Sequence, residues 1–324
     1  LLAMVVGGNK FLKDWGFETV IFSLLIGLFI SNIFSIPKWL KESLSSELFV
    51  KIGLVLLGTT VLFDDLLKAG ALGLIQSCVV VFTVWNFCFW LCRKMKIDKE
   101  MSLMLSSAVS ICGVSAAVAT AGAIKGDKTK LSYVVSLVLV VAVPMILIMP
   151  GLAKLMGLPE DMAGAWIGGT IDTTGAVAAT GAIYGEVALQ TSTIVKFSQN
   201  VLLGVAAFLI SIYWSYSKKE VTEEKPTLKV IWLRFPKFVL GFVAASLVFS
   251  FCVAPEVVSD AKPILKNIQG MWFALAFMSI GLETDFKSLI TSENRRSTYA
   301  FLGAQAFNVV FTLLVAWILF GLIA

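Results

Sequence analysis

The chain has 324 residues, of which 58% are hydrophobic and only 15% are charged, and its mean hydropathy is +0.90. Soluble domains carry about a quarter charged residues, so this composition excludes an ordinary soluble protein. The net charge of +5 comes from basic residues between apolar segments, which report orientation in a membrane rather than a nucleic-acid partner.

The residue types that are missing limit the chemistry. The chain has no histidine, and its five cysteines form no CxxC pair. This argues against a metal site, an imidazole base and a disulfide framework. No nucleotide-binding or hydrolase motif is present, so we expect neither an enzyme nor a bound cofactor beyond Na⁺ or H⁺ as a coupling ion.

Apolar segments predict an all-α polytopic membrane protein, in a single domain over residues 1–324. Each segment approaches the roughly 20 residues that one bilayer crossing requires. With the end of a further segment before Gly7, we expect about ten or eleven transmembrane helices in a plasma or inner membrane. The ten predicted spans are 20–36, 50–66, 70–92, 101–124, 131–153, 164–184, 192–214, 236–255, 268–285 and 298–323.

The distribution of Lys and Arg predicts the orientation. Loops after the odd-numbered spans hold 17 of the 26 basic residues, with Lys51 and Lys196 counted in the loops beside them. The positive-inside rule then places those loops in the cytoplasm and the C-terminus outside.

Two internal similarities indicate a repeat. Residues 117–126 and 176–185 agree at seven of ten positions, but one span separates them, so they would run in the same direction. This match fits shared small-residue composition as well as it fits a repeat. The motif 109–113 resembles 278–281 five spans later, which fits inverted five-helix repeats with crossing discontinuous helices.

Span four contains the strongest candidate site. Ser110, Cys112, Gly113 and Ser115 interrupt an apolar segment, and a helix broken near Cys112 and Gly113 would offer free N–H groups to an anion. Close helix packing through small residues is the alternative.

Span six adds Thr170, Asp172, Thr173 and Thr174 within an apolar segment. A carboxylate at membrane depth is costly and therefore indicates a functional site, so Asp172 is expected to carry Na⁺ or a proton with Thr174 beside it. If the span begins later than expected, Asp172 would instead lie at the interface.

Two further charges complete the candidate set. Lys196 in span seven is expected to attract the anion or to pair with Asp172, although a lysine near a helix end can also extend to the interface. Glu283 at the end of span nine is a candidate ligand for the coupling ion.

These motifs resemble the YeiH-like sulfate exporter family of the bile acid/arsenite/riboflavin transporter superfamily. The resemblance rests on Ser110–Gly113 and on Gly168–Thr170, Lys196 and Gly281–Leu282. It implies paired five-helix repeats (20–153 and 164–323), a core that moves against a panel as an elevator, and export of a small inorganic anion. This chain departs from the family pattern at Asp172–Thr173, where relatives have His-Glu, and at Gln199, where relatives have Arg. Both changes alter charge at the expected site. The resemblance therefore leaves open whether the substrate is sulfate, sulfite or another small anion.

Three functions follow. The first is a secondary transporter of a small anion, with Ser110, Cys112, Gly113, Ser115, Thr170, Thr173 and Lys196 at the substrate. The second is a cation/proton antiporter that uses Asp172 and Lys196. The third is a membrane enzyme or sensor. The expected partners are the small anion, the lipid bilayer and, as an option, a second copy of the chain in a homodimer, with no nucleic acid.

Overall fold

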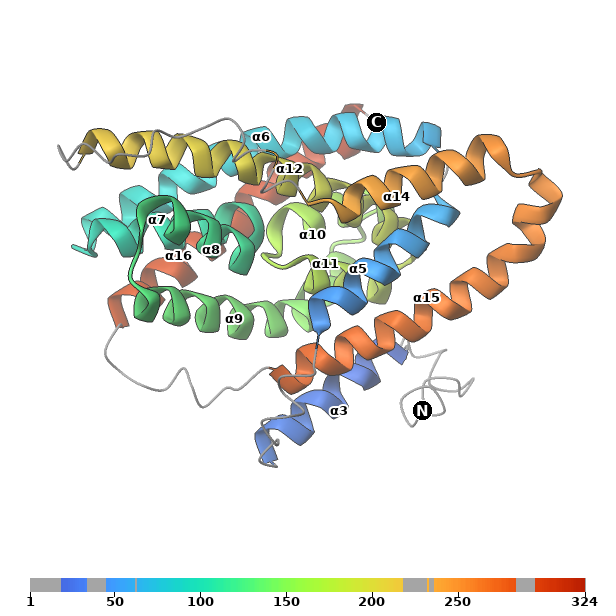
Figure 1. Cartoon of the computed structure of the whole chain (residues 1–324), viewed down its shortest axis with the longest axis horizontal. Helices are drawn as coiled ribbons and strands as arrows, with labels where there is room; N and C mark the ends of the chain where they lie inside the picture. The colour runs from blue at the N-terminus through green and yellow to red at the C-terminus, as the bar shows by residue number, and fades with distance from the viewer. Residues whose placement is uncertain are drawn as a thin grey trace.

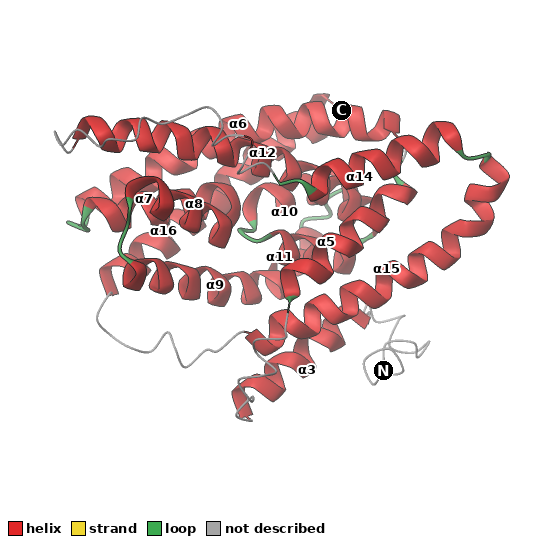
Figure 2. Cartoon of the chain, viewed as in Figure 1, coloured by secondary structure: helices red, strands yellow, loops and turns green. Residues whose placement is uncertain are grey.

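The computed structural model describes residues 19–33, 45–61, 63–217, 232, 236–283 and 295–323, in which every regular element is a helix (Figure 2). The helices of the first half are α3 (Thr19–Ile33), α5 (Ser46–Leu57, extended by a 3₁₀ turn Gly58–Thr60), α6 (Phe63–Lys94), α7 (Lys99–Ser107), a π-helical turn (Ala108–Cys112), α8 (Gly113–Ile124) and α9 (Lys128–Leu155). Those of the second half are α10 (Glu160–Thr170), α11 (Thr174–Tyr184), α12 (Glu186–Ser217), α14 (Phe238–Leu247, extended by a π turn Val248–Cys252), α15 (Pro255–Glu283) and α16 (Arg295–Ala316, extended by a π turn Trp317–Ile323).

The length and surface of the helices are those of a polytopic membrane protein. Within the described part of the chain, five stretches are long and apolar enough to cross a bilayer: Leu66–Lys94, Lys99–Ile124, Lys128–Leu155, Glu186–Trp214 and Arg295–Leu322. Large apolar side chains also face outward, among them Phe82 at 73% and Val310 at 69% exposure. Lipid rather than water is the solvent that suits such a surface. The expected all-α membrane class is therefore confirmed.

The stretch 99–124 does not extend across the molecule, although its length fits a membrane span. After the π turn the chain reverses, and the end of α8 returns to the start of α7. There the Asp127 N–H donates to Glu100 Oε1 at 2.7 Å, and Lys130 Nζ lies 2.8 Å from both Asp98 Oδ1 and Glu100 Oε2. A straight helix of this length would separate its ends by about 39 Å. Residues 99–124 thus form a helical hairpin, the first hairpin, instead of the expected crossing helix.

The stretch 160–184 forms a second hairpin in the same way. The Val187 N–H donates to Glu160 Oε2 at 2.9 Å, and the Tyr184 hydroxyl donates to Leu158 O at 2.5 Å. The first contact joins the start of α12, directly after α11, to the start of α10, and the second joins the end of α11 to the residues just before α10. Span six is therefore also a reversal and not a crossing.

The two hairpins start from opposite ends of α9, which runs straight beside them in Figure 1. The first hairpin opens near Lys128, where α9 begins, and the second opens near Leu158, just after α9 ends. Their tips meet between these ends. It follows that α8 and α11 run in opposite directions, contrary to the sequence expectation for segments 117–126 and 176–185.

Helix α15 is continuous from Pro255 to Glu283, so no break occurs near Gly281 as far as the structure describes this segment. A Cβ atom at Gly281 would lie 2.5 Å from Leu24 O, and one at Gly27 would lie 2.5 Å from Met278 O. The small residues here serve close packing of α15 against α3. Glu283 ends the helix, and its side chain lies outside the described part of the structure.

The helices form two groups in Figure 1. We call α3, α5, α14 and α15 the outer layer, because α15 packs on α3 and α5, and α14 packs on α5. We call α6 to α12 together with α16 the inner bundle. A cluster of buried apolar residues that includes Leu54, Phe242, Phe277 and Trp166 joins the outer layer to the inner bundle.

Candidate functional site

The backbone at each hairpin tip leaves helical geometry. In the first hairpin Cys112 has φ −150° and ψ 47°, and Gly113 has φ 43° and ψ −110°. In the second hairpin Ile171 and Thr173 are extended. The break expected near Cys112 and Gly113 is therefore present, and a second break lies at the segment that contains Asp172.

The two tips are in direct contact. A Cβ atom built at Gly113 would lie 3.2 Å from the carbonyl oxygen of Asp172. Across the same contact Cys112 Sγ lies 3.9 Å from Thr174 Oγ1. The small side chains of the sequence motif thus allow the hairpins to meet backbone to backbone.

Lys196 on α12 holds the tips together. Its Nζ atom donates to Ile111 O at 2.7 Å in the first hairpin and to Ile171 O at 2.9 Å in the second. A third bond goes to Gln199 Oε1 at 2.9 Å, and the Gln199 amide donates in turn to Gly169 O at 3.0 Å. An ammonium group has three N–H donors, so all the donors of Lys196 are used.

Asn308 and Gln305 on α16 bind neighbouring carbonyl groups at the two tips. Asn308 Nδ2 lies 3.2 Å from Val109 O and 3.1 Å from Thr170 O, and Gln305 Nε2 lies 3.0 Å from Thr170 O. One carbonyl group of the π turn and one at the end of α10 thus receive side-chain donors. A polar residue in an apolar span predicts an interhelical hydrogen bond, and Gln305 and Asn308 both form such bonds.

Asp172 is 1% exposed, so its side chain lies inside the protein. Neither of its carboxylate oxygens accepts a hydrogen bond from the described residues, and none of the ion pairs among them includes it. A buried carboxylate without partners is costly when ionised. The side chain is therefore suited to carry a proton or to bind a cation.

The second half of each hairpin begins at a cavity of about 900 Å³. Cys112, Val114 and Ser115 of the first hairpin line it, together with Thr173–Ala176 of the second and Asn200 of α12. The Thr173 hydroxyl accepts the N–H of Ala176 at 3.2 Å, whereas no side chain of the described residues caps the start of α8. The positive ends of two helix dipoles thus converge on one cavity.

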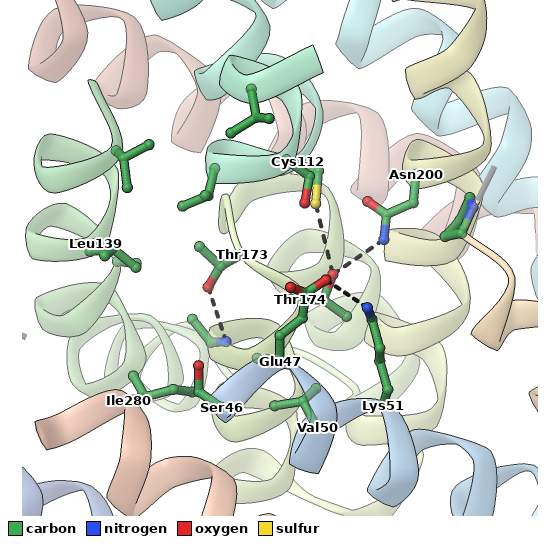
Figure 3. A pocket seen from close by; sticks show the side chains of 18 of the residues that line it. Ser46, Glu47, Val50, Lys51, Cys112, Leu139, Thr173, Thr174, Asn200 and Ile280 are labelled. Atoms are coloured by element: carbon green, nitrogen blue, oxygen red, sulfur yellow. Dashed lines mark hydrogen bonds and ion pairs between the residues drawn. The ribbon is translucent and has the colours of Figure 1, made fainter. Parts of the chain in front are cut away.

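The opposite wall of the cavity belongs to the outer layer. It is lined by Ser46, Glu47, Val50 and Lys51 of α5 and by Ile280 of α15, as Figure 3 shows. Pro236–Phe238 at the start of α14 complete this wall. The cavity therefore lies between the outer layer and the tips of the inner bundle.

The predicted site residues divide into those at the cavity and those behind it. Cys112, Ser115, Thr173 and Thr174 line the cavity. Gly113 forms the tip contact, and Lys196 and Asp172 lie behind the tips. Ser110 is buried and its hydroxyl donates to Ser106 O at 2.7 Å, as a helical serine does when it bonds four residues back.

Thr170 is likewise buried, with no hydrogen-bond partner for Oγ1 among the described residues. Three charged residues that were not predicted from the sequence as site residues also line the cavity: Glu47, Lys51 and Lys237. The spacing of Glu47 and Lys51 by four residues was a signal for an ion pair on one helix face.

Long apolar helices around two helical hairpins that meet tip to tip define a polytopic α-helical membrane protein with discontinuous helices at a central cavity. The family described as "Conserved hypothetical protein 698" matches residues 1–300, and the chain belongs to this family.

Two relatives of the chain are named as membrane proteins. The chain is 39% identical to UPF0324 membrane protein RB9488 of Rhodopirellula baltica, over 99% of this chain and 61% of that protein. It is 37% identical to a UPF0324 membrane protein of Nitratidesulfovibrio vulgaris, over 100% of this chain and 58% of that protein. The chain thus spans about three fifths of the length of these relatives. No solved structure matched the chain.

Proposed function

We propose that the protein is a secondary active transporter of a small inorganic anion of the sulfate or sulfite kind, in the plasma or inner membrane. One observation carries this proposal: two oppositely directed hairpins place the starts of α8 and α11 at one cavity. Backbone N–H groups and helix dipoles there favour negative charge, and Ser115, Thr173 and Thr174 add hydroxyl donors.

The topology supports this proposal when the hairpins are treated as re-entrant. Of the ten segments expected to cross, eight then cross the membrane and two enter from opposite sides. The opening of the first hairpin is basic and would face the cytoplasm, with Arg93, Lys94, Lys96, Lys99, Lys125, Lys128 and Lys130 around it. The opening of the second hairpin is mainly acidic, with Glu160, Asp161 and Glu186.

An inverted repeat of a hairpin and its following helix underlies this topology, in place of the expected division at 20–153 and 164–323. The two units are 99–155 and 160–217. Each begins with a glutamate that accepts an N–H just after its second half-helix, Glu100 from Asp127 and Glu160 from Val187. The seven-of-ten match between 117–126 and 176–185 falls at the same place in both units.

Transport proceeds by movement of the inner bundle against the outer layer, which would act as core and panel of an elevator. The cavity supports this assignment because its two walls belong to the two groups. Asp172 takes up the coupling ion, H⁺ or Na⁺, since its oxygens are buried and accept no hydrogen bond among the described residues.

Flux into proteoliposomes tests the proposal. Sulfite or sulfate uptake is expected to fall strongly in Ser115→Ala and Thr174→Val and to lose its ion dependence in Asp172→Asn. Ser136→Ala is the matched control, because this hydroxyl donates to Ser132 O on α9 away from the cavity. Absence of anion flux in the wild-type protein would refute the proposal.

A cation/proton antiporter is the second candidate, and the unpartnered Asp172 beside a buried lysine favours it. That activity would appear as cation-driven proton movement in the absence of any anion substrate. It would be lost in Asp172→Asn and unaffected by Ser115→Ala.

A further inference from the structure

The outer wall of the cavity carries an ion pair directly opposite the hairpin tips. On α5, Lys51 Nζ lies 2.7 Å from Glu47 Oε1, one helical turn away. Both residues line the cavity that Cys112, Thr174 and Asn200 line from the other side (Figure 3). The side chain of Glu47 is 74% exposed and that of Lys51 is 38% exposed.

Lys51 is held at this position from two sides. Glu47 binds its ammonium group, and the ring of Phe238 lies with its centroid 5.7 Å from Nζ. On the same helix, Val50 and Leu54 are buried in the apolar cluster that joins the outer layer to the inner bundle. The lysine thus stands on an anchored helix, with its charged end at the cavity.

An anion in this cavity needs a positive charge nearby. Lys196, the basic residue at the tips, uses its three N–H donors on Ile111 O, Ile171 O and Gln199 Oε1. It is also 1% exposed and does not line the cavity. Among the described residues Lys51 has one carboxylate partner, Glu47, and this partner is largely exposed, so replacing it costs little free energy.

We propose that Lys51 supplies the counter-charge for the transported anion, and that the anion replaces Glu47 as the partner of Lys51. This inference rests on the proposed function and adds a residue of the outer layer to the substrate site. In the empty cavity Glu47 neutralises Lys51 and repels weakly held anions. A bound oxyanion accepts hydrogen bonds from Lys51 on one side and from the starts of α8 and α11 on the other.

The two sets of contacts come from groups of helices that move relative to each other in the proposed cycle. The anion therefore links the outer layer to the inner bundle while it occupies this cavity. Once the inner bundle moves, Lys51 stays behind and pairs with Glu47 again, which weakens anion binding on the far side. Lys51 should accordingly determine affinity on the side to which this cavity opens and have little influence on the other side.

The experiment compares anion binding and sided flux in three variants of α5. Binding of sulfate and sulfite is measured by thermal shift on the purified protein, and half-saturation is measured separately for anion presented on each face of proteoliposomes. Lys51→Gln is expected to weaken binding by about tenfold or more, the effect of losing one charge-assisted hydrogen bond. Glu47→Gln is expected to strengthen binding several-fold, and Lys51→Arg to retain it.

Lys68→Gln is the matched control, because Lys68 is exposed on α6 and does not line the cavity. A Lys51→Gln protein that binds anion like the wild type, while Ser115→Ala does not, would overturn this inference and leave the proposed function intact. Equal effects of Lys51→Gln on both faces would overturn the sided role. Absence of anion binding by the wild-type protein would instead refute the proposed function itself.

Discussion

Gly113 and Asp172 touch at the point where the two hairpins meet, with 3.2 Å between a Cβ position at Gly113 and the carbonyl oxygen of Asp172. This contact joins segments that enter the bundle from opposite ends of α9. It fixes the depth at which the starts of α8 and α11 reach the cavity. A change at this contact should therefore affect stability and transport together.

Gly113→Ala should lower both the thermal stability and the anion flux. The backbone has φ 43°, where residues with a Cβ are strained, and the new methyl group would lie 2.6 Å from Val138 Cγ1. Strain of this kind costs about 1–3 kcal/mol. Thermal unfolding in detergent measures the loss. Gly151→Ala on α9 is the control, because no atom lies within 4 Å of a Cβ there, and an equal effect of the two substitutions would contradict the argument.

Lys196→Met should destabilise the protein more than any substitution of an exposed lysine. It leaves the carbonyl groups of Ile111 and Ile171 buried without their shared donor, and each unsatisfied group costs about 1–3 kcal/mol. The tips should then separate and expose Cys112, which is 8% exposed. Alkylation of Cys112, followed by peptide mass spectrometry, should be faster than in the wild type. Lys154→Met serves as the comparison, and unchanged alkylation in Lys196→Met would contradict the bridging role.

The opening of the first hairpin should make stability depend on pH through Asp98. Partial burial raises the pKa of this carboxyl group, but hydrogen bonds from Lys130 and from the Met101 N–H outweigh it and hold the pKa below the ordinary 3.8. Because the folded-state pKa is lowered, the stabilisation is complete above the unfolded value and is lost as the pH falls through the folded value.

Asp98→Asn keeps an oxygen for the Met101 N–H and removes the titration. The exposed pair contributes about 1 kcal/mol or less. The difference in thermal midpoint between wild type and variant should therefore be small at neutral pH and should vanish in acid. A constant difference down to the lowest pH at which the protein stays folded would contradict this assignment.

The sequence predicted the class of protein and the position of one break, because both depend on local composition. The length of an apolar segment indicates a membrane segment, and a glycine after a cysteine in a serine-rich stretch indicates where a helix can break. The sequence did not predict that 99–124 reverses. Two half-helices contain the same residues as one crossing helix, and the deciding contact joins Glu100 to Asp127, 27 positions apart.

Side-chain roles were harder to predict for a similar reason. Two of the three partners of Lys196 are backbone carbonyl groups, which every residue carries, so these two partners could not be read from residue types. Lys51 was counted with a loop because the apolar segment was expected to begin at residue 50, whereas α5 begins at Ser46. Because α5 begins four residues earlier than expected, Lys51 lies on the helix that lines the cavity and not in the loop before it.

Cysteine accessibility should separate a hairpin from a crossing helix at residues 99–124. Cysteines introduced as Lys96→Cys and Lys125→Cys lie on either side of this segment, and a crossing helix would place them on opposite faces of the membrane. The hairpin places both on one face, since Glu100 binds the Asp127 N–H. Lys154→Cys, at the far end of α9, should lie on the other face.

A membrane-impermeant maleimide applied to right-side-out and inverted vesicles measures the exposed face, and peptide mass spectrometry locates each label while the native cysteines remain in place. Lys96→Cys and Lys125→Cys should react from the cytoplasmic face alone, because the basic residues around this opening favour that side. Reaction of these two positions from opposite faces would show that the segment crosses. The starts of α8 and α11 would then not meet at one cavity, and the proposed anion site would be refuted.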